Sequence, residues 1–116
     1  MRRGEVRMVD LEPVRGSEAN TRRPAVIVSN DGANTMAEQL GTGVLTVVPV
    51  TTSTARVYPF QVLLPAGRTG MKRDSKAQAE QVRSVAVERV GEVVGRVPDD
   101  ISRLLDDALR LHLSLG

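Results

Sequence analysis

The sequence predicts a mainly β domain with appended helices, an α+β fold in which short strands form a small, strongly bent barrel. Three observations support this prediction. Short apolar runs rich in β-branched residues recur along the chain, Gly, Pro and Asn separate them, and one amphipathic helical pattern follows Pro98. The 116 residues contain no repeat and no linker-like tract, so we expect one domain over residues 1–116.

Four strands are predicted in the first part of the chain. Residues 5–11 alternate imperfectly, and residues 24–29 form a β-branched run typical of a buried strand. Val44–Thr51 is apolar on both faces, as expected of a central strand, and a further strand is predicted over residues 60–64. Because Pro49 has no N–H to donate to a β-ladder, one edge of the central strand should be unpaired near it.

Helices and turns are predicted between and after these strands. Residues 12–23 form a polar loop, residues 33–40 form a short helix, and residues 67–70 suit a hairpin turn or loop. The segments 76–85 and 91–97 are expected to close the β portion of the chain.

A terminal helix is predicted to begin at Pro98. Proline in the first turn favours a helix start, and so do the acids Asp99 and Asp100 beside the positive end of the helix dipole. Apolar spacing along the helix predicts one stripe that packs on the core, made of Ile101, Leu104, Leu105, Ala108, Leu109 and His112.

Composition excludes several kinds of site. Without cysteine there is no disulfide and no thiolate metal site, and the single histidine, His112, lies on the stripe of the terminal helix. No carboxylate cluster has metal-ligand spacing, and no glycine-rich nucleotide motif is present, so we expect neither a metal nor a cofactor. No apolar run is long enough to span a membrane and no signal peptide begins the chain, so we expect no membrane partner and a cytoplasmic location.

The charge of the chain is unevenly distributed. The net charge is +2, most arginines and lysines precede residue 84, and acids gather in the terminal helix. This pattern fits a surface that contacts phosphates, although composition alone favours ordinary solvated charge. Tyr58 and Phe60 are the only aromatic residues. Recognition of bases by several stacking platforms is therefore not expected, and hydrogen bonds and charge must supply most of the affinity.

An enzyme with this composition must use Arg, Thr, Ser, Asp, Glu and Gln, and RNA cleavage is a reaction that suits these groups. RNA carries its own nucleophile, the 2′-hydroxyl, so positioning and electrostatic stabilisation supply much of the rate. A guanidinium matches two phosphate oxygens in bidentate geometry, which a lysine ammonium does less well.

Four segments, in order, resemble the MazF/PemK/Kid family of toxin endoribonucleases. RRGEVRMVDLEP resembles the first strand of the family, GSEANTRRPAVIVSND its GSE…RPxVVVSND signature, VLTVVPVTT its next conserved strand and KAQAEQVRSV its EQIRT segment. The resemblance spans nearly the whole chain. It implies an SH3-like, PemK-type barrel and a homodimer that cleaves single-stranded RNA at selected sequences without metal, leaving a 2′,3′-cyclic phosphate and a 5′-hydroxyl. It also implies inhibition by a cognate antitoxin.

The resemblance assigns catalytic roles to two residues. Arg23, directly before Pro24, matches the catalytic arginine of the family and would hold the scissile phosphate and stabilise its developing charge. Its neighbour Arg22 should point the other way, because successive side chains alternate along an extended segment. Thr51 matches the catalytic threonine, whose hydroxyl would bond the phosphate or the 2′-oxygen. Without the resemblance, the favoured interpretation of Thr51 is a strand-end hydroxyl that caps a turn.

Further residues are weaker candidates from the same motifs. Glu18 and Glu80 are carboxylates that would act as a base or contact RNA. RNA contacts are also expected from Ser17, Asn20, Ser53, Gln81 and Arg83.

The chain also departs from the family pattern. Arg7 occupies a position where an aromatic residue, often Trp, is usual, so stacking there is in doubt. Residues 54–58 are predicted to form a mobile loop over the substrate, and sequence selectivity commonly resides in such loops.

Two other functions compete with this hypothesis. One is a non-catalytic CcdB-like toxin that binds DNA gyrase, and the other is an SH3-like module that only binds nucleic acid or protein. RNA cleavage by the purified protein separates the first hypothesis from both.

Overall fold

The computed structural model describes residues 1–11 and 22–116. Its elements, in chain order, are β1 (Glu5–Asp10), β2 (Arg22–Ile27), α1 (Asp31–Leu40), β3 (Val44–Thr51), β4 (Gln61–Leu64), α2 (Ala66–Thr69), β5 (Ser75–Gln78), η1 (Ala79–Gln81), β6 (Arg83–Ala86), η2 (Val87–Arg89), β7 (Val90–Arg96) and α3 (Asp99–Leu113).

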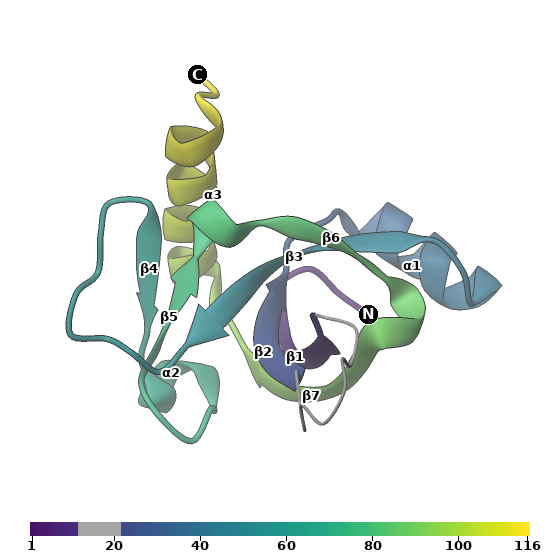
Figure 1. Ribbon diagram of the computed structural model, residues 1–116, viewed down its shortest axis with the longest axis horizontal. Helices are drawn as coiled ribbons and strands as arrows, with labels where there is room; N and C mark the ends of the chain where they lie inside the picture. Colours follow the sequence, from purple (N-terminus) through teal and green to yellow (C-terminus); the bar gives the residue numbers. More distant parts are fainter. Residues whose placement is uncertain (12–21) are drawn as a thin grey trace, which may run out of the picture.

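All paired strands are antiparallel and form one seven-stranded sheet in the order β4-β5-β3-β2-β1-β7, with β6 also paired to β3. The sheet curls so that β7, β1 and β2 wrap under the long strand β3 (Figure 1). Irregularities in the β1–β7 register, on either side of Arg7, accompany this curvature. The prediction of a mainly β fold with appended helices and a bent sheet is confirmed.

Strand β3 is the centre of the sheet and changes partner along its length. Val44 to Val47 pair with β6, whereas Val50 and Thr51 pair with β5. Pro49 lies between the residues of β3 that pair with β6 and those that pair with β5. Neither β6 nor β5 therefore requires the backbone N–H that proline lacks. The unpaired edge expected near Pro49 is therefore the point where the partner of β3 changes from β6 to β5.

Two apolar clusters fill the two faces of this bent sheet. One includes Val26, Val48 and Leu64 and is covered by Ile101 and Leu105 of α3. The other includes Ile27, Leu45 and Val47 on the opposite face. Alternate residues of β2 and β3 enter opposite clusters, so the core fixes which way each side chain points.

Helix α1 begins earlier than predicted. Asn30 is its N-cap and accepts a hydrogen bond from the backbone N–H of Ala33, at 2.8 Å. The helix thus begins directly after Asn30, three residues beyond the end of β2 at Ile27. Gly41, with a φ of +65°, then ends the helix in the left-handed region.

Two predictions between residues 65 and 86 are corrected. The segment 67–70 lies in the connection between the antiparallel strands β4 and β5, as predicted, but it is helical, because residues 66–69 form the short helix α2 after Pro65, ended by Gly70 at a φ of +80°. The segment 76–85 is not one strand. It divides into β5 and β6, separated by the 3-10 turn η1, because its two ends pair with different parts of β3.

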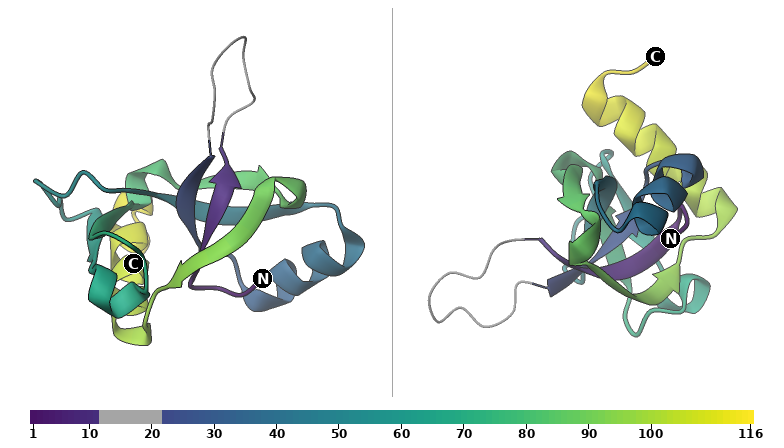
Figure 2. Two further views of the ribbon diagram at one scale, coloured as in Figure 1. Left: turned by 90° about the horizontal axis from the view of Figure 1, so that it is seen from below. Right: turned by 90° about the vertical axis from the view of Figure 1, so that its right-hand side faces the viewer.

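The stripe predicted on α3 is partly wrong. Ile101, Leu105 and Ala108 are buried as expected, but Leu104 is 56% exposed and His112 is exposed. Helix α3 runs along the β4 and η1 end of the molecule, while α1 lies at the opposite end (Figure 2). In the part of the chain that the structure describes, no helix is both long and apolar enough to cross a membrane.

We predict that Leu105→Ala lowers the free energy of unfolding by about 2–5 kcal/mol, because it opens a cavity between α3 and the sheet. Urea denaturation at fixed protein concentration measures the change. Arg103→Ala, at an exposed position on the same helix, is the control and should change the value by no more than about 0.5 kcal/mol. Equal stability of the two variants would contradict the packing of α3 described above.

Candidate active site

The register between β2 and β3 brings two of the predicted residues together. Ala25 pairs with Pro49, so continuing the antiparallel register by two residues places Arg23 opposite Thr51. Both residues line a cavity of about 170 Å³, whose other lining residues are Pro24, Val50, Thr52 and Ser75. The described lining of the cavity therefore has one guanidinium and three hydroxyl side chains, and no carboxylate is among these residues.

Arg22 and Arg23 lie on opposite faces of β2. The guanidinium of Arg22 is engaged by the carboxylate of Glu92 on β7. The pKa of the Glu92 carboxyl lies below its ordinary value, held there by its own backbone N–H and then by Arg22. The Arg23 side chain is exposed and makes no hydrogen bond or ion pair within residues 1–11 and 22–116. Its charge is thus available for an anion in the cavity.

Thr51 ends β3 with a hydroxyl that already has one partner. Its Oγ1 accepts a hydrogen bond from the backbone N–H of Ser53, at 3.2 Å. This is the turn-capping role that the sequence left open. A threonine hydroxyl can also donate one hydrogen bond, so the cap orients Oγ1 and leaves its proton free for a phosphate oxygen.

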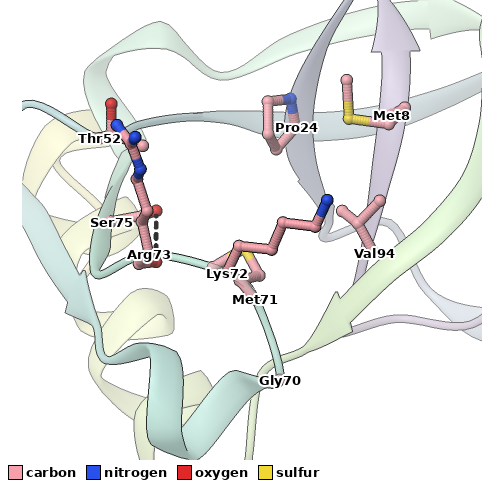
Figure 3. Close-up of a pocket in the computed structure, with 9 residues that line it drawn as sticks. All are labelled: Met8, Pro24, Thr52, Gly70, Met71, Lys72, Arg73, Ser75 and Val94. Atoms are coloured by element: carbon pink, nitrogen blue, oxygen red, sulfur yellow. Dashed lines mark hydrogen bonds between the residues drawn. The ribbon is translucent and has the colours of Figure 1, made fainter.

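A larger groove of about 470 Å³ adjoins this cavity and shares Pro24, Thr52 and Ser75 with it. Met8, Pro24 and Val94 lie on one side of the groove, on β1, β2 and β7 (Figure 3). The segment that follows α2 forms the other side. There the Lys72 side chain reaches across the opening, and Arg73 runs along the side of Thr52 and Ser75 (Figure 3).

The loop between β3 and β4 is held by more contacts than the sequence suggests. Lys76 of β5 is only 7% exposed, and its Nζ donates a hydrogen bond to the carbonyl oxygen of Arg56 at 2.6 Å. The same Nζ lies 5.9 Å from the ring centroid of Tyr58. Tyr58 in turn stacks on Phe60, with ring centroids 5.4 Å apart. Since Lys76 is the cross-strand partner of Thr51, the loop is anchored beside the cavity.

Glu80 lies apart from the Arg23–Thr51 cavity. One of its carboxylate oxygens accepts a hydrogen bond from Nε2 of Gln61 at 2.7 Å, while the other is buried and has no partner. Gln61 also accepts a hydrogen bond from the backbone N–H of Tyr58, at 3.2 Å. Within one chain, Glu80 therefore supports the base of the β3–β4 loop, and its predicted role as a base remains untested.

The other candidates are dispersed. Ser53 is exposed in the β3–β4 loop, Gln81 is exposed in η1, and Arg83 is exposed on β6 opposite Val47. None of the three lines the two cavities described above. Ser17, Glu18 and Asn20 lie outside the described residues.

The structure adds residues that the sequence did not single out. Ser75 and Lys76 reach the site because β5 pairs with the end of β3, and a pairing between distant segments leaves no local pattern in the sequence. Met71, Lys72 and Arg73 reach it through the turn after α2. Across residues 1–11 and 22–116, no group of three or more His, Asp or Glu side chains is arranged to hold a metal ion.

Comparison with protein families gives one match that covers nearly the whole chain. Residues 2–113 match the family described as PemK-like, MazF-like toxin of type II toxin-antitoxin system.

Individual relatives agree with this match. The chain is 62% identical over 115 residues to Endoribonuclease MazF9 of Mycobacterium tuberculosis, covering 99% of this chain and 98% of the relative. It is 30% identical over 115 residues to Endoribonuclease EndoA of Bacillus subtilis, covering 99% and 96%. A solved mycobacterial structure, described as an endoribonuclease in complex with its cognate antitoxin, has the same fold with a TM-score of 0.76. That structure is 23% identical, and the match covers 100% of this chain and 97% of the other.

We predict that Lys76→Met releases the β3–β4 loop, because methionine fills a similar volume but cannot donate a hydrogen bond to the Arg56 carbonyl. Hydrogen–deuterium exchange should be faster at the amides of residues 54–58 and unchanged in the core strands. Lys72→Met, at an exposed position, is the matched control. If both variants exchange like the wild type over residues 54–58, Lys76 does not anchor the loop.

Proposed function

The chain belongs to the PemK-like, MazF-like family of type II toxins and acts as an endoribonuclease, and we propose that it cleaves single-stranded RNA at selected sequences without a metal ion. The reaction is attack of a 2′-oxygen on the adjacent phosphorus. A bond forms between these two atoms while the bond from phosphorus to the 5′-oxygen breaks. The products are a 2′,3′-cyclic phosphate and a 5′-hydroxyl.

Arg23 is the proposed catalytic residue for charge stabilisation. Its exposed guanidinium has no counter-ion within the described residues and faces a cavity lined by hydroxyls, which is the observation that carries the proposal. Two N–H groups of a guanidinium can bind two phosphate oxygens at once and hold the charge that grows on the pentacoordinate phosphorus. Stabilisation suits arginine better than proton donation, because its guanidinium does not lose a proton in proteins.

Thr51 is the proposed second contact to the reacting group. Because its Oγ1 is oriented by the Ser53 N–H, its proton is directed by the turn and can bond a phosphate oxygen or the 2′-oxygen. None of the described residues that line the cavity is a carboxylate, so the base that removes the 2′-proton is sought among other residues. Glu18 and Glu80 remain the proposed candidates, and Ser17, Asn20, Ser53, Gln81 and Arg83 remain proposed RNA contacts.

We propose that a cognate antitoxin inhibits the protein and that both act in the cytoplasm. The solved relative bound to its antitoxin supports this partner. Charge supports it too, because Arg23, Lys72 and Arg73 are exposed and have no ion pair among the described residues. An acidic segment that folds on binding could cover both cavities at once.

We propose that the protein is a homodimer and that the face between α3 and β4 joins the two copies. A groove of about 390 Å³ lies on this face, and Leu63, Leu104 and Leu111 line it although they are 45%, 56% and 56% exposed. Adjacent exposed leucines are unusual on a monomer surface and are typical of an interface.

We predict that Arg23→Ala lowers the cleavage rate by about 10²-fold or more, the loss typical of removing one group that stabilises transition-state charge. A gel assay on a long RNA in the presence of EDTA, with analysis of the product ends, measures it. Arg22→Ala is the control and should keep most of the rate, because Arg22 is held by Glu92. Both variants should unfold within about 0.5 kcal/mol of each other, since both positions are exposed.

Three outcomes would contradict parts of this proposal. A near wild-type cleavage rate in Arg23→Ala would show that Arg23 is not a catalytic residue. Loss of cleavage in EDTA, restored by added metal, would end the metal-independent mechanism. A folded wild-type protein that cleaves no RNA would favour gyrase binding or a simple binding module.

We predict that Thr51→Ala slows cleavage while Thr51→Ser restores most of the rate, because serine keeps the hydroxyl that the Ser53 N–H orients. Single-turnover rates with saturating protein measure this effect. An unchanged rate in Thr51→Ala would move the role to Thr52 or Ser75, which line the same cavity.

We predict that Leu104→Glu converts a dimer into a monomer, because a charge cannot be buried in an apolar interface without a partner. Analytical ultracentrifugation measures the mass. Met36→Glu introduces the same charge at a 58% exposed position on α1, at the other end of the molecule, and should remain a dimer (Figure 2). A dimeric Leu104→Glu protein would place the interface elsewhere.

A further inference from the structure

We propose that the groove beside the Arg23–Thr51 cavity binds the nucleobase next to the scissile phosphate, and that Met8 and Met71 supply the facing walls that contact it. This inference rests on the proposed function, because the occupant is the RNA strand that is cut at Arg23 and Thr51. It adds a base-selecting site to the phosphate-binding cavity.

Continuity with the cavity is the first reason. The groove and the cavity share Pro24, Thr52 and Ser75 as lining residues, so they lie side by side. A strand whose phosphate contacts Arg23 and Thr51 has its neighbouring nucleotide beside this opening. The groove measures about 470 Å³, within the range of about 300–1,000 Å³ that is common for pockets that hold small molecules.

The apolar walls are the second reason. Met8, Pro24 and Val94 form one side and Met71 the other, and all four are only partly buried (Figure 3). Thioether sulfur packs favourably on aromatic rings. The only aromatic side chains in the sequence, Tyr58 and Phe60, stack on each other in the β3–β4 loop. The methionines therefore offer a surface for a base in this groove, which neither aromatic residue lines.

Charge at the rim is the third reason. Lys72 and Arg73 line the groove, both are exposed, and neither has an ion pair among the described residues. Six other arginines are paired with carboxylates, namely Arg2, Arg3, Arg7, Arg22, Arg68 and Arg110, whereas Arg56, Arg83, Arg89, Arg96 and Arg103 also have no ion pair among the described residues. None of the described residues that line the groove is acidic. An occupant with a flat apolar face and a flanking negative charge fits both features, and a nucleotide has both.

The backbone holds the second wall in place. Gly70, with a φ of +80°, ends α2 and turns the chain toward β7. Gly95 of β7 then allows close approach, because a Cβ there would lie 2.7 Å from Cγ of Met71 and 2.9 Å from the carbonyl oxygen of Thr69. Met71 is thus set against the sheet by backbone packing, so the groove is formed before RNA binds.

The test uses an RNA oligonucleotide that the wild type cuts, with each nucleotide replaced in turn by an abasic one. In the wild type, the abasic substitution beside the scissile phosphate should lower kcat/KM about tenfold or more. That loss of kcat/KM should fall to about twofold or less in Met71→Ala and, independently, in Met8→Ala on the opposite wall. The losses caused by abasic nucleotides at other positions should be unchanged. Met71→Leu keeps an apolar wall and should keep most of the penalty.

The rim cations give a separate readout. Lys72→Gln and Arg73→Gln should raise KM equally for every oligonucleotide and should each reduce the salt slope of RNA binding by about one. An unchanged KM and an unchanged salt slope would show that Lys72 and Arg73 do not contact the RNA.

Equal abasic penalties in the wild type, Met71→Ala and Met8→Ala at every position would overturn the base assignment and leave the groove to a protein partner. A wild type that cuts no RNA would overturn the proposed function and the inference with it. The two failures are therefore distinguishable.

Discussion

The antiparallel register between β2 and β3 is the constraint on which the rest of this structure depends, because Arg23 and Thr51 line one cavity just beyond its last pair, Ala25 with Pro49. The valines of both strands enter the two apolar clusters alternately, so a slip of one residue would turn every side chain to the wrong face. Packing of the core therefore sets the geometry of the site. Pro49 adds a second constraint, since β3 passes there from β6 to β5 and carries Thr51 to the edge of the groove.

Electrostatic pairing decides which arginine is free to act. Arg22 is held by Glu92, whose pKa is lowered by its own backbone N–H and by that guanidinium. Arg23, one residue later and on the opposite face, faces a cavity that no carboxylate of the described residues lines. A cation with no nearby counter-ion is the group that gains most when a phosphate arrives. Lys72 and Arg73 likewise have no ion pair among the described residues, and they line the groove beside the cavity. Cations without an ion pair therefore lie at both the cavity and the groove.

Local patterns predicted much of the fold and less of the site. The limits of β3 and the helix that follows Pro98 followed from apolar runs and capping residues, which are local properties. The pairing of β5 with the end of β3 is not local, so residues 76–85 were expected to be one strand, and Ser75 and Lys76 were missed. The resemblance identified Arg23 and Thr51, and the β2–β3 register explains why residues so far apart in sequence share one cavity.

A crystal structure of the protein bound to an uncleavable RNA would test the central claim most directly. The oligonucleotide carries a 2′-deoxy nucleotide at the cut, so the nucleophile is absent. We predict that its scissile phosphate contacts the Arg23 guanidinium and the Thr51 hydroxyl, and that the adjoining base lies between Met8 and Met71. A phosphate held instead beside Gln81 and Arg83, with the Arg23–Thr51 cavity empty, would contradict this account of the site.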